Sequence, residues 1–122
     1  MNNTDRKKHD RLFQEHLIEK NPVSILGGKT EVIHHFIPKA KGWSIRWYVP
    51  NGIPLTNKQH GEIHGKRRAE LEGHIIRIME KREKGWRDKI RNQQRRTAKD
   101  LNNFLILNHI YGEIDNYIKY ER

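Results

Sequence analysis

Two stretches decide the fold that we expect for this chain: EVIHHFIP at residues 31–38 and NGIPLTNKQHGEIHG at residues 51–65. The first is rich in β-branched residues and ends at Pro38, as a strand does before a turn. The second passes from a loop into a helical pattern, and Thr56 is placed to cap that helix. Four of the eight histidines of the chain lie in these two stretches, which makes them the first candidates for a functional site.

Helices are expected on both sides of these stretches. Periodic apolar residues predict a helix over 4–20, and residues 23–26 form a candidate strand. A strand at 32–37 is followed by a turn at 39–42, a second strand at 43–49 and a loop at 50–52. The next helix is expected over 55–72, then a basic helical segment with Gly85 as its weak point, and a last helix over 101–120.

The composition restricts the class of protein. The chain has 122 residues, with 25 Lys or Arg against 15 Asp or Glu, which gives a net charge of +10. Only 34% of the residues are hydrophobic, which predicts one compact domain or a small module with appended helices. The chain has no cysteine, which excludes disulfides, Cys-based zinc knuckles, iron–sulfur clusters and thiol nucleophiles. The charge favours a polyanionic partner, and nucleic acid is the first candidate.

Neither secretion nor membrane insertion is expected. Residues 1–10 are polar and lack the apolar segment of a signal peptide. No apolar run approaches the roughly 20 residues that a membrane-spanning helix needs. We therefore expect a cytoplasmic protein with no membrane partner.

The spacing of the histidines favours a metal site. His60 and His64 are four residues apart, which places both imidazoles on one face of a helix. Such a pair can bind a divalent ion, and the tandem His34-His35 offers a third ligand. Adjacent strand residues point to opposite faces, so the two tandem rings can take different roles. Either pair of histidines by itself is more often incidental than part of a site. The whole ordered set, with Asn51 between the two pairs, is a more specific signal.

This ordered set resembles the HNH, or ββα-metal (His-Me finger), endonuclease motif. The spacing is 16 residues from His35 to Asn51, nine from there to His60 and four more to His64, as the family pattern has it. The three-imidazole form is similar to the nuclease domains of bacterial DNase toxins, and the NGIPL segment is similar to small phage-borne HNH proteins. The resemblance covers residues 23–68.

The resemblance implies an α+β fold around a compact ββα-metal motif. Residues 1–72 would form the nuclease core, with a helix at 4–20 and the motif at 23–72, and residues 73–122 would form a basic helical extension. The implied activity is metal-dependent hydrolysis of DNA phosphodiester bonds, by nicking or double-strand cleavage. A phage-encoded protein of recombination, replication or packaging, working in a bacterial or phage-infected cell with proteins of those processes, is the implied setting.

The resemblance also implies a role for each residue of the motif. His34, His60 and His64 would bind one divalent metal ion, whose charge stabilises the transition state. His35 would be the general base, and Asn51 would hold the loop and hydrogen-bond near His35 to orient its ring. The ion could be Mg²⁺, Mn²⁺, Ni²⁺ or Zn²⁺, and imidazole ligands favour the last three over magnesium. After Leu55 the chain reads TNKQ where many members have a Cys-x-x-Cys zinc knuckle, so packing must hold the scaffold.

Basic residues in and beside the motif are candidates to bind DNA phosphates: Lys39, Lys41, Arg46, Lys58, Lys66, Arg67 and Arg68. Residues 77–99 add ten Lys or Arg against three acidic residues, a local net charge of +7, which favours binding to the phosphate backbone. A monomer with one site would nick DNA, whereas a homodimer formed through residues 101–120 could cut both strands.

Two other interpretations use the same features. One is a non-catalytic DNA-binding module that retains the HNH fold, although the intact His35 and Asn51 argue against it. The other is a structural metal site, held by histidines, in a protein–protein adaptor. Metal-dependent DNA cleavage separates the first expectation from both alternatives.

Overall fold

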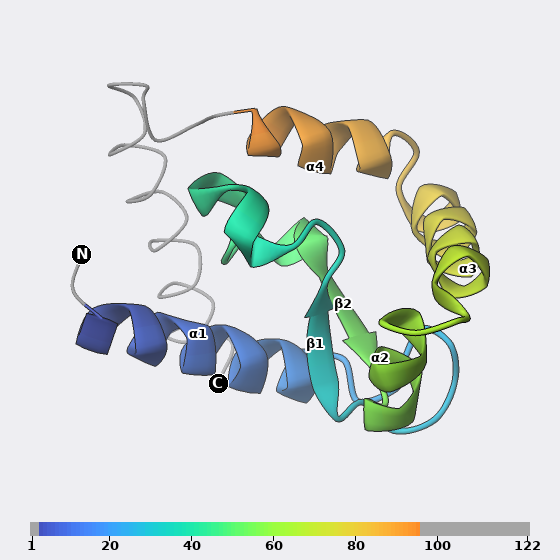
Figure 1. The fold of residues 1–122 in the computed structure, drawn as a ribbon, viewed down its shortest axis with the longest axis horizontal. Helices are drawn as coiled ribbons and strands as arrows, with labels where there is room; N and C mark the ends of the chain where they lie inside the picture. Colours follow the sequence, from blue (N-terminus) through green and yellow to red (C-terminus); the bar gives the residue numbers. More distant parts are fainter. Residues whose placement is uncertain (1–2, 96–122) are drawn as a thin grey trace.

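The structure, a computed structural model, describes residues 3–95 and has an α+β fold. Its helices and strands, coloured in chain order in Figure 1, are α1 (Asn3–Lys20), β1 (Val32–His35), β2 (Gly52–Leu55), α2 (Asn57–Ile63), α3 (Arg68–Arg82) and α4 (Trp86–Gln94). Three short 3-10 turns lie between the strands, at Lys39–Lys41, Trp43–Ile45 and Val49–Asn51. The predicted fold class is confirmed, and β1, β2 and α2 follow one another in a ββα arrangement.

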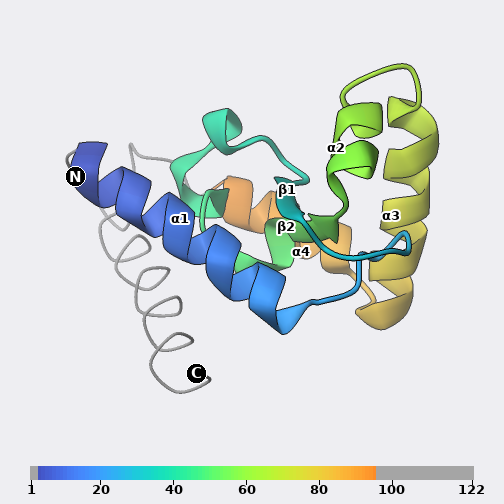
Figure 2. The ribbon, with the colours of Figure 1, turned by 90° about the horizontal axis from the view of Figure 1, so that it is seen from below.

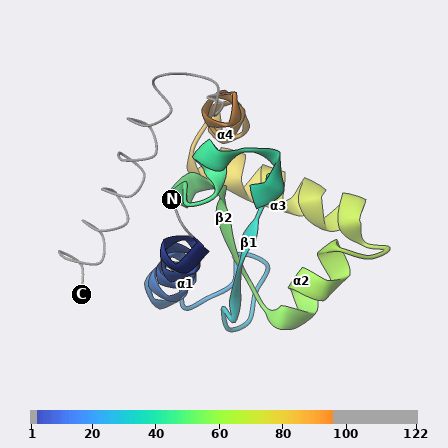
Figure 3. The same ribbon diagram turned by 60° about the vertical axis from the view of Figure 1, so that its left-hand side comes forward.

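The two strands form an antiparallel sheet that gives the tandem histidines different surroundings. His34 lies opposite Ile53 and His35 lies opposite Gly52. Because side chains alternate along a strand, Ile33 and His35 face α1, whereas His34 faces α2. In Figure 3 the sheet lies between these two helices.

A separate apolar cluster packs on each side of the sheet. Toward α1, the cluster consists of Phe13, Leu17, Ile33 and Trp47. The larger cluster lies on the other side and contains Ile37, Ile45, Ile53, Leu55, Ile63, Leu71, Ile75, Trp86 and Ile90. Figure 2 shows α2 and α3 side by side, at the end of the molecule away from the start of α1.

Local signals in the sequence account for several helix ends. At the start of α2, the Thr56 hydroxyl accepts a hydrogen bond from the backbone N–H of Gln59, and the Gln59 side chain accepts one from the N–H of Thr56. This capping box confirms the predicted N-cap. Gly85 adopts φ = 86° between α3 and α4, a left-handed conformation that suits glycine, so the predicted weak point is a helix boundary.

Three of the expected elements were wrong. Residues 43–49 do not form a strand, and β1 pairs with β2 instead. Strand β2 begins at Gly52, the last residue of the expected loop. Residues 23–26 contribute one isolated bridge, from Val23 to Lys29. The helix expected over 55–72 is two helices, since the chain turns at Gly65, whose N–H bonds to the carbonyl of Glu62.

The C-terminal part of the described chain packs on the ββα arrangement. Helix α3 runs through the expected boundary at residue 72, and Ile75, Trp86 and Ile90 belong to the same buried cluster as Ile53 of β2. The helix expected over 101–120, and with it the expected homodimer contact, lies outside the described residues. Within residues 3–95, none of the helices has the length and apolar character needed to cross a membrane.

Candidate functional site

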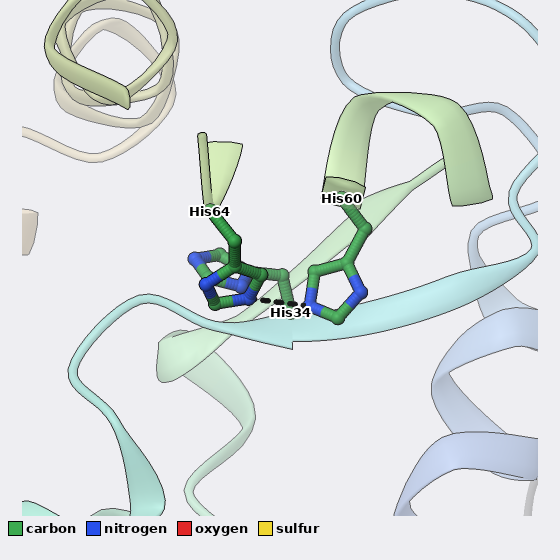
Figure 4. Close-up of side chains that lie close together, drawn as sticks. All are labelled: His34, His60 and His64. Carbon is green, nitrogen blue, oxygen red and sulfur yellow. Dashed lines mark hydrogen bonds between the residues drawn. The ribbon is translucent and has the colours of Figure 1, made fainter. Parts of the chain in front are cut away.

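Three histidines meet on the α2 side of the sheet. His34 comes from β1, His60 from the middle of α2, and His64 directly follows that helix. Their ring centroids are 4.7 to 5.4 Å apart, and one ligand nitrogen of each lies within 4.8 Å of the others. The rings point toward one another in Figure 4, where the dashed line marks the 3.1 Å separation between the Nε2 atoms of His60 and His64. This group could hold a metal ion.

The donor set of the three histidines suits a divalent transition metal. Two nitrogens bound at about 2.0–2.1 Å to one tetrahedral zinc ion are about 3.3 Å apart, close to the separation of His60 and His64. Burial and the neighbouring histidines His60 and His64 lower the pKa of His34 to about 3. Burial and then His64 also lower the pKa of His60. Neutral imidazole is the form that binds metals, so the surroundings favour the ligand state.

His35 lies on the opposite face of β1, against α1. Its ring stacks on Phe13, with 5.2 Å between the ring centroids. Its Nε2 atom is 2.7 Å from the carbonyl oxygen of Arg46. A carbonyl only accepts hydrogen bonds, so Nε2 carries the proton and the neutral ring presents its lone pair at Nδ1. Burial lowers the pKa of His35, an effect only partly opposed by this hydrogen bond, so the neutral ring is favoured.

One cavity of about 300 Å³ is lined by the histidines from both faces of β1. His34 and His35 line it together with His60 and His64. Lys39 and Gln14 also contribute to its wall. A three-imidazole group and a separate neutral imidazole are therefore accessible from the same opening.

Asn51 holds the backbone of the connection between the strands. It is fully buried; its Oδ1 atom accepts a hydrogen bond from the N–H of Ile37 at 2.8 Å, and its Nδ2 atom donates to the Ile37 carbonyl at 2.9 Å. Nδ2 also lies 3.4 Å from the carbonyl of Ile45. The expected loop-holding role agrees with these contacts, but the hydrogen bond that orients His35 comes from the Arg46 carbonyl instead.

The basic residues expected at the DNA interface fall into two groups. Four lysines are exposed, of which Lys39 also lines the cavity: Lys39, Lys41, Lys58 and Lys66. The three arginines form ion pairs within the chain: Arg46 with Asp10, Arg67 with Glu62 and Glu70, and Arg68 with Glu72. Arg46 is also mostly buried, with 16% of its side chain exposed, so its guanidinium group serves the fold.

Two polar residues of α1 that no sequence motif indicated, Asp10 and Gln14, bind β1 and the connection after it. Gln14 accepts a hydrogen bond from the N–H of Ile33 and donates one to its carbonyl, both at 2.8 Å. Asp10 binds Arg46 and Trp47. A signal was present, because Asp10 and Gln14 share one helical face with the buried Phe13, where polar residues need partners.

Comparisons of the chain with protein-family models, with curated proteins and with solved structures give no significant match.

Proposed function

We propose that this protein is a metal-dependent endonuclease of the HNH type that hydrolyses DNA phosphodiester bonds. The observation that carries the proposal is that two adjacent histidines of β1 lie on opposite faces of the strand and line the same cavity. His34 joins a three-histidine group on one face, and His35 is a separate neutral imidazole on the other, yet both line one cavity. Hydrolysis of a phosphodiester by one metal and one base requires such a pair of groups on one opening.

His35 is the general base in this proposal. With its Nε2 proton held by the Arg46 carbonyl, the ring can take a proton from water at Nδ1. As it does so, the water oxygen attacks phosphorus and the bond from phosphorus to the 3′ oxygen breaks. The departing 3′ oxygen takes a proton from solvent, which completes the hydrolysis.

His34, His60 and His64 hold the metal ion in this proposal. A bound divalent ion supplies positive charge that polarises the scissile phosphate and stabilises the charge on the departing oxygen. The three side chains come from β1, α2 and the residue after α2, so the sheet and helix must be packed together for the ligands to meet.

The charge of the chain supports DNA as the substrate. The net charge is +10, and Lys39 lies on the wall of the cavity that holds the histidines. Lys41, Lys58 and Lys66 are exposed and lie within a few residues of the cavity-lining residues Lys39, His60 and His64 in the sequence. In this proposal the lysines bind phosphates on either side of the scissile one, so affinity should fall as salt rises.

Cleavage of supercoiled plasmid, with Mg²⁺, Mn²⁺, Ni²⁺ and Zn²⁺ in turn, tests the proposal. We expect the wild type to nick the plasmid in a metal-dependent manner, and His35→Ala to slow cleavage by about 100-fold or more while still binding Zn²⁺. His34→Ala should lose both Zn²⁺ binding and cleavage. His74→Ala is the matched control, because His74 lies half-exposed on α3 outside the cavity and should behave as wild type.

Three outcomes would contradict the proposal. If the His35→Ala variant cleaves DNA at the wild-type rate, His35 is not the general base. Salt-sensitive DNA binding without cleavage under any of the four metals would favour a non-catalytic DNA-binding module. Loss of folding on chelation, without DNA affinity, would favour a structural metal site.

A further inference from the structure

The backbone group that orients His35 lies in a segment without regular secondary structure. The Arg46 carbonyl belongs to the peptide unit between Arg46 and Trp47, and neither residue lies in a described helix or strand. The N–H of Tyr48 bonds to the Ile45 carbonyl at 3.3 Å, which closes a turn with this peptide unit at its centre. The central peptide unit of such a turn has two opposite orientations, as in type I and type II turns, so side-chain contacts on either side of it can select the direction of its carbonyl.

One carboxylate binds the side chains on both sides of this peptide unit. Asp10 accepts hydrogen bonds from Nε and Nη2 of Arg46, at 2.8 and 2.5 Å, in a two-bond arrangement. The same carboxylate accepts a hydrogen bond from Nε1 of Trp47 at 2.9 Å. Charge-assisted bonds of the two-bond kind are both strong and directional. We call these three residues, Asp10, Arg46 and Trp47, the Asp10 cluster.

The Asp10 cluster is itself held firmly. The Trp47 side chain is fully buried in the apolar cluster that includes Phe13, and the Arg46 guanidinium group lies 5.5 Å from the centre of the Trp47 ring. Asp10 is one helical turn before Phe13, the residue that stacks on the His35 ring. Helix α1 therefore contacts His35 directly through Phe13, and through Asp10 it binds the side chains on both sides of the peptide unit that carries the acceptor of His35.

We propose that Asp10 is a positioning residue for the general base: it fixes the peptide unit between Arg46 and Trp47, so that the Arg46 carbonyl holds the Nε2 proton of His35 and keeps Nδ1 directed at the cavity. The catalytic part of this inference rests on the proposed nuclease function. The structural part, one dominant His35 tautomer that depends on Asp10, does not.

Asp10→Asn tests the inference, because it keeps the size of the side chain but removes its charge and one acceptor. In two-bond ¹H–¹⁵N spectra at pH 8, the wild type should show His35 as the Nε2–H tautomer, and Asp10→Asn should show a mixture of tautomers or exchange broadening. In single-turnover plasmid nicking, the variant should be 10- to 100-fold slower, with Zn²⁺ affinity and DNA affinity within twofold of wild type.

Two further variants keep the test decisive. Trp47→Phe removes the bond from Nε1 to Asp10 and leaves Arg46 bound to that carboxylate, but it also removes part of a fully buried ring, so its stability is measured alongside. It should change the tautomer ratio and the rate in the same direction as Asp10→Asn but less, and it replaces Asp10→Asn if that variant does not fold. Ile90→Val removes one buried methylene in the other apolar cluster, so it controls for stability loss and should keep the wild-type tautomer and rate.

The outcomes separate this inference from the proposed function. A wild type that cuts DNA, with Asp10→Asn equally fast, overturns the positioning role whatever the spectrum shows. If the wild type fails to cut DNA with any of the four metals, the proposed function alone is overturned. The tautomer measurement then still decides what Asp10 does to His35. A His35 spectrum unchanged by both variants overturns the inference.

Discussion

At the scale of single residues, side chains that make hydrogen bonds to buried backbone groups determine the geometry of the site. Gln14 bonds to the backbone of Ile33 in β1, and Asn51 bonds to the backbone of Ile37 in the connection after it. Asp10 bonds instead to the side chains of Arg46 and Trp47 in that connection. An unpaired buried polar group costs more free energy than a typical hydrogen bond contributes, so such residues tolerate few substitutions.

Asn51→Ala should lower the free energy of unfolding by about 2–4 kcal/mol, because it removes the partners of both backbone groups of Ile37. Urea unfolding followed by circular dichroism measures this change. Asn92→Ala is the control, since Asn92 is exposed in α4 and should change stability by less than about 0.5 kcal/mol. Equal effects of the two substitutions would show that the Asn51 amide contributes little.

Asp10 should make stability depend on pH. Burial alone raises the pKa of Asp10, but the hydrogen bonds and charge of Arg46, the bond from Trp47 and the charge of Lys39 together lower it below its usual value. A carboxyl group with a lowered pKa in the folded state stabilises the fold above its unfolded pKa, and this contribution is lost as the pH falls through the folded pKa.

Wild type should therefore exceed Asp10→Asn in stability at pH 6, and the difference should be smaller at pH 3, because the stabilisation decreases as the pH falls below the unfolded pKa of about 3.9 and is lost through the lower folded pKa. Urea unfolding of both proteins at the two pH values gives the comparison. A difference that is the same at pH 3 as at pH 6 would mean that the charge of Asp10 does not stabilise the fold.

At the scale of elements, the sequence predicted those features that depend on neighbouring residues. Helix α1, the Thr56 cap and the break at Gly85 follow from local periodicity, capping and backbone conformation. The segment 43–49 was mistaken for a strand because its β-branched and aromatic residues fit one. In the fold, Ile45 and Trp47 are buried in two different apolar clusters, so packing decides the conformation of this segment.

The contact of α1 with β2 leads to a prediction at Gly52. A Cβ atom there would lie 2.7 Å from Cδ1 of Leu17, 2.9 Å from Cγ2 of Ile33 and 3.0 Å from Cζ of Phe13. Gly52→Ala should therefore push α1 away from the sheet and cost about 1–3 kcal/mol. Because Phe13 also stacks on His35, the substitution should slow DNA cleavage as well.

Gly73→Ala is the matched control for Gly52→Ala. Apart from the adjacent residues and the backbone of α3, no atom of the described residues lies within 4 Å of a Cβ atom built at Gly73, so alanine should stabilise the protein by about 0.5–1 kcal/mol. Thermal unfolding of the two variants should shift in opposite directions. A neutral Gly52→Ala would show that α1 can move without cost.

At the scale of the whole molecule, the histidine group links parts of the chain that are distant in sequence. His34 is on β1, and His60 and His64 belong to α2 and its end, so an ion bound by all three requires the folded state. A ligand that binds only the folded state stabilises it by mass action. The metal site should therefore be detectable through stability, without any measurement of activity.

Addition of Zn²⁺ at about 100 times its Kd should stabilise the fold by about 2.7 kcal/mol and raise the Tm by roughly 10 °C. Chelation should reverse the shift. His60→Ala should abolish it and His74→Ala should retain it, as differential scanning calorimetry can measure. Equal Zn²⁺ shifts in both variants would place the bound metal elsewhere in the chain.

The sequence by itself determined the helix-forming segments, the capping of α2, the net charge and the spacing that brings His60 and His64 to one helical turn. These depend on interactions between residues a few positions apart. Only the tertiary structure decided that β2 pairs with β1, that His34 is buried among histidines while His35 stacks on Phe13, and that Arg46 binds Asp10. Those contacts join residues that are distant in sequence, and the burial of apolar side chains on both faces of the sheet selects among them.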